Sequence, residues 1–286
     1  MEGNGSERER VLCGAELRGF EQYLREQERS AATIGKYLHD VRCFADFVED
    51  GAVGRQVVLD YKAWLGERYA VASANSMLAA LNCFLRFCGQ HALCVKQFRV
   101  QRQAYCSADK ELTRAEYLRL LDAANERRNG RLHLILQTVC GTGIRVSELR
   151  YITVEALRHG EATVHCKGKS RRVFLVPELR KKLLRYAEEQ GLRSGSVFIT
   201  RGGRPIGRQA IWREMKGLCA RARVAPGKVF PHNLRHLFAR TFYSLERDIA
   251  KLADILGHAS INTTRIYIVT TGEEHRRKLE LMRLVV

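Results

Sequence analysis

The stretch VFPHNLRHLFARTF, residues 229–242, combines the start of a helix with two basic side chains on one face. Pro231 suits the first turn of a helix, where its missing amide hydrogen costs no hydrogen bond. His232 and Arg235 are three residues apart, so they project from the same side of that helix. Because a helix amino terminus attracts anions, the stretch predicts an imidazole and a guanidinium aimed at a negatively charged group.

The whole chain is basic, and its charge is unevenly distributed. It has 286 residues, with 49 lysines and arginines against 31 aspartates and glutamates, which gives a net charge of +18. Divided near residue 107, it carries a net charge of +1 before that point and +17 after it. A charge of this size concentrates polyanions at a protein surface. We therefore expect nucleic acid as the partner; a basic protein whose charges are spread over solvated faces is the alternative.

The cysteines and the amino terminus indicate a cytoplasmic protein. The nine cysteines are an odd number, are spread through predicted helices and form no Cys-x-x-Cys pair. This usage is typical of a reducing compartment and offers no convincing zinc site. The sequence MEGNGSERER has no apolar core, and no apolar run is long enough to cross a membrane. We expect no membrane association.

Two domains are predicted. The first hundred residues read as about four short helices, because apolar residues recur every three or four positions in TIGKYLHDVRCFADFV and SMLAALNCFLRFCGQ. We place a helical domain at residues 1–98 and a polar, basic linker at 99–110. A second domain at 111–286 begins with a capping box, in which Thr113 and Glu116 can satisfy the first free amides of a helix.

The second domain is predicted to add a small β-sheet to further helices. In ATVHCKGKSRRVFLV, residues 162–176, β-branched arms flank a Lys-Gly-Lys turn, which is typical of a hairpin. SVFIT, residues 196–200, reads as another short strand. A buried helix in LHLILQTVCGTGIRVSELRYI is expected to break at Gly141 and Gly143, before a new helix that carries Arg145 and Glu148. The fold class is therefore mainly α with a small β-sheet.

Six polar residues in this domain share one chemical logic. They are Arg145, Lys167, His232, Arg235, His258 and Tyr267. Taken singly, each has an ordinary structural interpretation. Together, two arginines can neutralise the non-bridging oxygens of a phosphodiester, a tyrosine can act as nucleophile once its ionised form is favoured, and a lysine can protonate the departing oxygen. This chemistry needs no metal ion.

At these positions the chain resembles the tyrosine recombinase family, the phage-integrase and Xer-like enzymes. GTGIRVSELRYI is similar to the family's first arginine box, PHNLRHLFA to its His-x-x-Arg box, and LADILGHASINTTRIYI to its final box, with nine residues from His258 to Tyr267. The boxes span about 130 residues in the family's order, which argues against coincidence. The resemblance implies an N-terminal helical core-binding domain and a mixed α/β catalytic domain.

The resemblance also implies a role for each site residue. Tyr267 would attack the scissile phosphate and become joined to the DNA 3′ phosphate, which frees a 5′ hydroxyl. Arg145 and Arg235 would clamp the phosphate. His232 would assist proton transfer, and His258 would hydrogen-bond the phosphate or the transition state.

Lys167 is favoured as the general acid by alignment with the family's hairpin. Lys169, two residues away, stays open as the alternative, as does a basic turn that only touches the DNA backbone. Glu148 lies three residues after Arg145 and is expected either to orient a site residue or to form a plain helix salt bridge. Asn233 and Leu237 depart from the family's common aspartate and threonine; Asn233 can still cap or hydrogen-bond locally.

The implied partner is double-stranded DNA, with four protomers on two duplexes and a possible contribution from accessory DNA-bending proteins. No cofactor and no ATP are expected, since the phosphotyrosine conserves the energy of the phosphodiester. The biological outcome could be integration, excision, inversion or resolution. The tail residues Leu281, Leu284 and Val285 could dock on a neighbouring protomer or on their own domain. Two alternatives are a type IB topoisomerase-like enzyme and a non-cleaving DNA-binding accessory protein.

Overall fold

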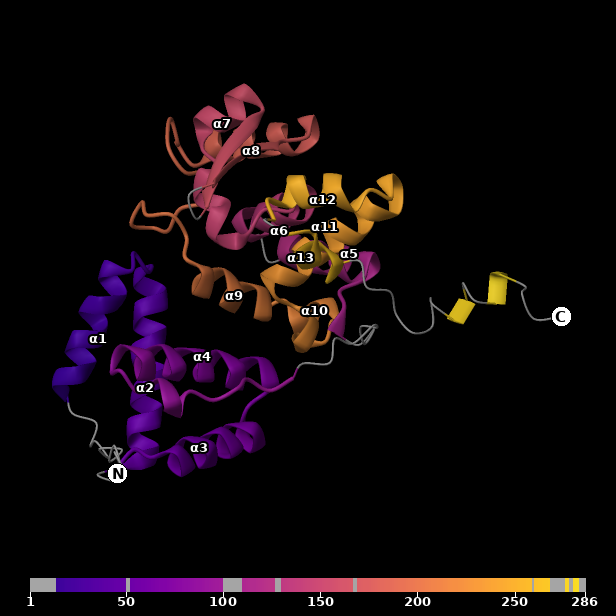
Figure 1. The fold of residues 1–286 in the computed structure, drawn as a ribbon. Helices are drawn as coiled ribbons and strands as arrows, with labels where there is room; N and C mark the ends of the chain where they lie inside the picture. Colours follow the sequence, from indigo (N-terminus) through magenta and orange to yellow (C-terminus); the bar gives the residue numbers. More distant parts are fainter. Residues whose placement is uncertain are drawn as a thin grey trace, which may run out of the picture. The chain divides into compact units, whose positions relative to one another are not determined.

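The computed structural model describes residues 14–49, 52–99, 110–126, 130–166, 169–258, 260–267, 276–277 and 280–282, without the side chains of 14, 15, 166 and 169. Its backbone forms two compact units, residues 1–102 and 103–286. Each unit is helical over most of its described length (Figure 1). The two units are taken one at a time below.

The described part of the N-terminal unit contains the four helices that the sequence predicts. They are α1 (Gly14–Glu26), α2 (Ala31–Val48), α3 (Arg55–Arg68) and α4 (Val71–Phe87), followed by the 3-10 helix η1 (His91–Leu93). Ser30 caps α2 by accepting a hydrogen bond from the Thr33 amide. Phe20 and Phe84 meet edge to face at 5.2 Å between ring centroids, so α1 and α4 share part of a core.

The C-terminal unit is built from helices with a single hairpin among its described residues. Its helices are α5 (Arg114–Glu126), α6 (Gly130–Thr142), η3 (Val146–Tyr151), α7 (Val154–His159), α8 (Pro177–Glu189), α9 (Arg208–Lys216), α10 (Cys219–Ala222), η4 (Pro226–Lys228), α11 (Pro231–Glu246), α12 (Ile249–Leu256) and α13 (Ile261–Arg265). The capping box of α5 is confirmed, because the Thr113 amide donates to Glu116 and the Glu116 amide donates to the Thr113 hydroxyl.

The predicted hairpin is confirmed, but the predicted strand in SVFIT is wrong. Strands β1 (Glu161–Cys166) and β2 (Lys169–Phe174) pair antiparallel, with Glu161 opposite Phe174. Residues 196–200 contribute only isolated bridges, from Ser196 to Thr153 and from Ile199 to Pro205. The β-branched and aromatic content of SVFIT reflects burial instead, since Val197 and Phe198 belong to the apolar core.

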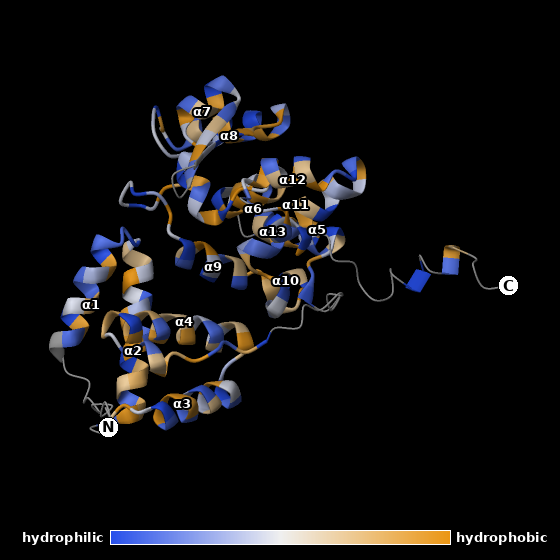
Figure 2. Ribbon diagram, in the orientation of Figure 1, coloured by the Kyte–Doolittle hydropathy of each residue, from blue (hydrophilic) through white to orange (hydrophobic). Residues whose placement is uncertain are grey.

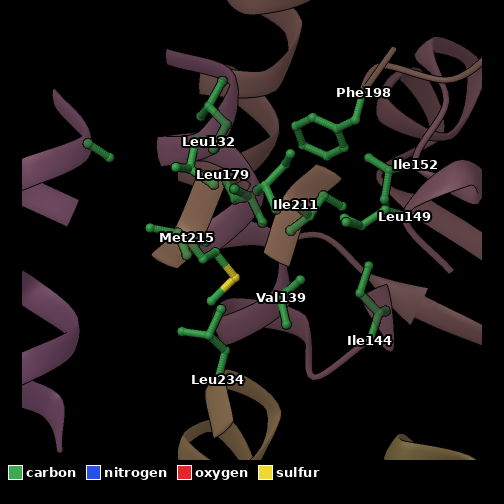
Figure 3. Packing of buried hydrophobic residues seen from close by; sticks show 14 of the residues in the cluster. Leu132, Val139, Ile144, Leu149, Ile152, Leu179, Phe198, Ile211, Met215 and Leu234 are labelled. Atoms are coloured by element: carbon green, nitrogen blue, oxygen red, sulfur yellow. The ribbon is translucent and has the colours of Figure 1, made fainter. Parts of the chain in front are cut away.

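The core of this unit is centred on α6. Figure 3 shows side chains of α6, α9 and α11 turned toward a common centre, among them Val139, Met215 and Leu234. Hydrophilic and apolar residues alternate along the same helices in Figure 2, as expected for helices with one buried face. This packing fixes α11, and therefore the residues it carries, against α6.

The end of α6 differs from the sequence prediction. Gly141 lies within the helix, and the break comes at Gly143, which has a φ of +65°. A Cβ at Gly143 would overlap the Phe238 ring and lie 3.1 Å from Cδ2 of Leu256. Arg145 therefore does not sit inside a new α-helix: it is the residue that caps the 3-10 helix η3.

Within the described residues, no helix is both long enough and apolar enough to span a bilayer. In the tail, Leu281 and Met282 are exposed, at 74% and 55% of their surface. Leu284 and Val285 lie outside the described residues, so the expected docking of the tail stays a prediction.

Candidate active site

Arg235 lies on α11 with only 1% of its surface exposed. Its Nη1 donates a hydrogen bond to the carbonyl of Gly143 at 2.5 Å, and its Nη2 donates to the carbonyl of Leu256 at 2.7 Å. Gly143 follows the end of α6 and Leu256 is the last residue of α12, so both carbonyls carry the partial negative charge of a helix C-terminus. Burial, followed by the charge of Arg145, lowers the pKa of Arg235 to about 10, which still leaves a buried cation at neutral pH.

His258 is held in one tautomer by two neighbours. Nη2 of Arg235 lies 2.9 Å from Nε2 of His258, and a guanidinium can only donate. Nε2 is therefore the acceptor and Nδ1 carries the hydrogen, which it donates to the Thr264 hydroxyl at 2.9 Å. Burial and the charges of Arg235 and Arg145 lower the pKa of His258 to about 4. The neutral ring thus links α11 to α13.

Tyr267 is buried beside α13, with 5% of its surface exposed. Its amide donates to the Thr264 carbonyl at 2.9 Å, which fixes the backbone just after the helix. Its ring stacks on the imidazole of His236, with centroids 4.2 Å apart and planes 28° apart. The ring of His258 lies 5.3 Å away, tilted by 33°. The phenol is therefore enclosed by imidazole rings contributed by different segments.

His232 stands at the hydroxyl of Tyr267. Its Nε2 lies 3.4 Å from the phenolic oxygen, a long hydrogen bond that the structure places between α11 and the segment after α13. Burial, and then the charges of Arg235, Arg145 and Arg208, hold the pKa of His232 below its ordinary value. A neutral imidazole can accept a proton, so the geometry and the charge state of His232 both suit a base for this phenol.

Glu148 joins two arginines beneath the site. One carboxylate oxygen accepts from Nη1 of Arg145 at 2.9 Å and from Nη1 of Arg171 at 3.2 Å. The other accepts from the Arg145 amide at 2.8 Å and from Nη2 of Arg171 at 2.9 Å. The Glu148 side chain is only 2% exposed. Burial by itself raises the pKa of its carboxyl, but these hydrogen bonds and the charge of Arg171 hold it below the ordinary value.

A cavity of about 430 Å³ opens beside these groups. Arg145, Arg208, His232 and Arg235 line it, together with apolar residues that include Trp212. Three guanidinium groups at one hollow offer an anion several charge-assisted hydrogen bonds. Across the described part of the chain, no group of three or more histidine, cysteine, aspartate or glutamate side chains is placed to hold a metal ion.

Comparison with known proteins decides the family. Residues 110–274 match the model of the phage integrase family, and residues 17–90 match the phage integrase N-terminal SAM-like domain. The Xer tyrosine recombinase A of Thermococcus kodakarensis is 31% identical over 93% of this chain and 94% of its own length. The chain belongs to the phage integrase family. It is thus a tyrosine recombinase by descent, and membership supports site-specific recombination by DNA cleavage and rejoining.

Further relatives and solved structures of the tyrosine recombinases agree with this assignment. The Xer recombinase A of Pyrococcus furiosus is 26% identical over 97% of each chain. A λ integrase tetramer bound to a Holliday junction has a TM-score of 0.75 at 17% identity, over 92% of this chain and 78% of that one. The XerH recombinase bound to its difH substrate has a TM-score of 0.70 at 17% identity, over 95% and 85%. These two likenesses show the shared fold.

Most of the predicted site residues of this tyrosine recombinase lie together. Tyr267, His232, Arg235 and His258 are linked by direct contacts. Arg145 lines the same cavity as His232 and Arg235. Glu148 contacts Arg145 as predicted, and it also binds Arg171, so it is more than a plain helix salt bridge. Lys167 lies outside the described residues. The backbone of Lys169 pairs with Cys166 at the end of the hairpin, and its side chain is not described.

The sequence analysis missed several neighbours of the site, among them His236 and Arg171. His236 stacks on Tyr267 and follows His232 by four residues, which is the spacing of one helix face. Arg171 reaches Glu148 from β2. The alternation of a strand places Arg171 on the same face as the buried Val173 and Leu175. A charged residue that alternates with buried apolar residues could have indicated, from the sequence, that Arg171 has a buried partner.

Proposed function

We propose that this chain is a site-specific tyrosine recombinase that cleaves and rejoins duplex DNA through a 3′-phosphotyrosine intermediate. The observation that carries the proposal is the meeting of Tyr267 with His232, Arg235 and His258 beside a cationic cavity. Family membership supports the class of reaction. The contacts among these residues support the role that we propose for each of them.

Tyr267 is the proposed nucleophile. Its phenolic oxygen forms a bond to the scissile phosphorus while the bond from phosphorus to the 5′ oxygen breaks. The phenolic proton passes to Nε2 of His232, which lies 3.4 Å away and carries a lowered pKa. The stacked ring of His236 limits the motion of the phenol and so keeps its oxygen near His232.

Arg145 and Arg235 are the proposed phosphate clamp. Charge accumulates on the non-bridging oxygens during in-line displacement, and preorganised guanidinium groups stabilise it. Arg235 keeps its Nε hydrogen without a hydrogen-bond partner among the described residues, although that atom is buried. A buried unpaired donor is costly, and a phosphate oxygen would satisfy it. Nε2 of His258 accepts from Arg235, so we assign His258 to holding that guanidinium in position.

Lys167 is the proposed general acid that protonates the departing 5′ oxygen, with Lys169 as the alternative. The cleaved strand then holds a phosphotyrosine that conserves the energy of the phosphodiester, so rejoining needs no ATP. No metal ion is needed in this scheme, because Arg145 and Arg235 neutralise the charge of the phosphate. A 5′ hydroxyl from a second duplex attacks the phosphotyrosine and expels Tyr267. We propose four protomers on two duplexes, in line with the related λ integrase tetramer bound to a Holliday junction.

A nicked suicide substrate tests the mechanism. After cleavage, the short fragment that carries the freed 5′ hydroxyl diffuses away. The covalent protein–DNA adduct therefore accumulates and can be quantified on a denaturing gel. We expect the wild-type chain to form the adduct and Tyr267→Phe to form none while it still binds the duplex. Residual adduct in Tyr267→Phe would refute the assignment of the nucleophile.

Other outcomes separate this proposal from its rivals. A wild-type chain that binds DNA without any adduct would be a non-cleaving accessory protein. Relaxation of a supercoiled plasmid that lacks a specific site, without exchange of strands between duplexes, would indicate a type IB topoisomerase-like activity. A substrate with a better leaving group at the 5′ position tests the general acid. We expect it to restore cleavage by Lys167→Ala. If it restores cleavage by Lys169→Ala instead, the general acid is Lys169.

A further inference from the structure

Arg171 makes three hydrogen bonds that connect separate parts of the C-terminal unit. From β2 it donates two to the carboxylate of Glu148 in η3, at 3.2 and 2.9 Å. Its Nε donates a third to the carbonyl of Ile255 at 3.1 Å. Ile255 precedes Leu256, whose carbonyl accepts from Arg235. Arg171 therefore holds both the partner of Arg145 and the helix end that binds Arg235.

The acceptors of Glu148 are fully used by these contacts. A carboxylate offers about four lone-pair sites, and Glu148 receives four hydrogen bonds, two from Arg171 and two from Arg145. One negative charge is thus shared between two guanidinium groups, and the three side chains keep a net charge of +1. Arg145 is 35% exposed and faces the cavity, whereas Arg171 is 13% exposed.

Without Arg171, Arg145 would be the only arginine left to neutralise the carboxylate of Glu148. Glu148 is nearly inaccessible to water, so its carboxylate would depend on the cation that remains. Arg145 would turn further toward Glu148 to fill the vacated acceptor sites, and the pair would become neutral. Less positive charge would then be presented to an anion in the cavity.

We propose that Arg171 is a positioning residue of the recombination site, which shares Glu148 with Arg145 and so leaves Arg145 free to neutralise the scissile phosphate. The inference rests on the proposed function, because it assigns Arg145 to that phosphate. Arg171 itself contacts no DNA in this scheme and acts through Glu148 and Ile255.

Gly257 supports the same arrangement. It follows α12 with a φ of +65°, and a Cβ there would lie 2.7 Å from Cδ and 3.1 Å from Nε of Arg171. The guanidinium can cross the end of α12 only because no side chain stands at Gly257. The space beside α12 is therefore matched to the path of Arg171.

The neighbouring Arg172 provides a matched control. It lies on the same strand, is 68% exposed and comes no nearer than 3.7 Å to the carboxylate of Glu161. Arg171→Gln and Arg172→Gln each remove one positive charge, and the two positions are neighbours in the sequence. We expect Arg171→Gln to slow adduct formation on the suicide substrate by about tenfold or more and Arg172→Gln to stay within about twofold of wild type. Arg171→Lys keeps the charge and should fall between them.

A charge-neutral substrate separates positioning from a general structural role. In a methylphosphonate linkage, a methyl group replaces one non-bridging oxygen, so the scissile group carries no charge for Arg145 to neutralise. We expect the deficit of Arg171→Gln relative to wild type to shrink on this substrate to about threefold or less. A purely structural defect would persist unchanged. Thermal melting of each variant reports whether it is folded.

The outcomes distinguish a failure of the role of Arg171 from a failure of the proposed function. If wild type forms adduct and folded Arg171→Gln is as fast as Arg172→Gln, the inference is wrong and the proposed function stands. An equal deficit on phosphate and methylphosphonate substrates, or an Arg171→Lys variant slower than Arg171→Gln, also overturns it. If wild type forms no adduct at all, the proposed function fails and this inference fails with it.

Discussion

At the scale of single residues, the hydrogen bond between His258 and Thr264 defines the state of the site. Nδ1 of His258 donates to a hydroxyl that is completely buried. We expect Thr264→Val, which keeps the shape and removes the acceptor, to lower the free energy of unfolding by about 1–3 kcal/mol, because a buried donor loses its partner. Urea denaturation measures the effect. Thr263→Val, at the exposed neighbouring position, serves as the control and should change it little.

The histidines around Tyr267 also predict how stability depends on pH. Burial, then the charges of His232 and Arg235, lower the pKa of His236 to about 4, and His258 titrates at a similar value. In the unfolded chain a histidine titrates near about pH 6.5, so between these values the unfolded state binds more protons than the folded state. The contribution of both neutral rings to the free energy of unfolding is therefore fully present above about pH 6.5, and it is lost as the pH falls toward 4.

Melting temperatures measured between pH 7.5 and pH 4.5 test this dependence. We expect the melting temperature of the C-terminal unit to fall with pH, and less steeply in His236→Gln and His258→Gln. His91→Gln, an exposed position in the N-terminal unit, should leave the slope unchanged. A slope that neither site variant reduces would contradict the assigned environment of these rings.

The types of residue at the site could be predicted from the sequence because their spacing within each box is local. His232 and Arg235 occupy one face of α11, as three-residue spacing requires. The long-range contacts were not accessible in the same way. The bond from Arg171 to Glu148 spans 23 positions and depends on which face of the hairpin packs inward. The boundaries of the linker and the roles of the site residues stay predictions.

At the scale of elements, Gly143 couples the end of α6 to Arg235. Its left-handed backbone and its contact with Phe238 leave no room for a side chain. We expect Gly143→Ala to destabilise the protein by about 3 kcal/mol or more, from backbone strain and overpacking together. Gly141→Ala is the control, since a Cβ there meets only Leu179 at 3.9 Å; it should be neutral or stabilise by up to about 1 kcal/mol. Thermal unfolding should show a clear loss of melting temperature for Gly143→Ala and no loss for Gly141→Ala.

Asn233 ties the start of α11 to two carbonyls. Its Nδ2 donates to Lys110 at 2.8 Å and to Lys228 at 2.9 Å, so the local hydrogen bonding expected for this residue is confirmed. We expect Asn233→Asp to lower the free energy of unfolding by about 2–4 kcal/mol, because a carboxylate cannot donate to either carbonyl. Asn262→Asp, at an exposed position in α13, should have little effect. Equal stability of these two variants in urea would exclude this role.

Helices could be predicted where the apolar periodicity extended over many residues. The prediction of a strand was wrong where the pattern covered only a few residues. The helices α2 and α4 have 18 and 17 residues, enough turns for an apolar stripe to stand out. Five residues at 196–200 could not distinguish a strand from a buried connection. Of the two glycines at which a helix break was expected, Gly143 follows the end of α6 and Gly141 lies within it. The close approach of Phe238 to Gly143 comes from a distant part of the sequence, so the local pattern could not separate the two glycines.

At the scale of the whole molecule, the uneven charge predicts salt-dependent DNA binding. Residues 1–102 carry a net charge of +1 and residues 103–286 carry +17. We expect affinity for a non-specific duplex to fall by about a thousandfold or more between 50 and 200 mM salt if at least about six phosphates are contacted. Fluorescence anisotropy of a labelled duplex measures this slope. A dissociation constant that is flat across the range would mean that the positive charge does not face the DNA.

The burial of Tyr267 bears on how long a covalent state could last. Only 5% of its surface is open to solvent, and imidazole rings pack around the phenol. A phosphotyrosine formed in such surroundings would be poorly accessible to water, and its hydrolysis would leave a lasting break in the DNA strand. Exclusion of solvent at this one side chain would give an incoming DNA end time to arrive, and so would protect the substrate from strand loss while the strand stays open.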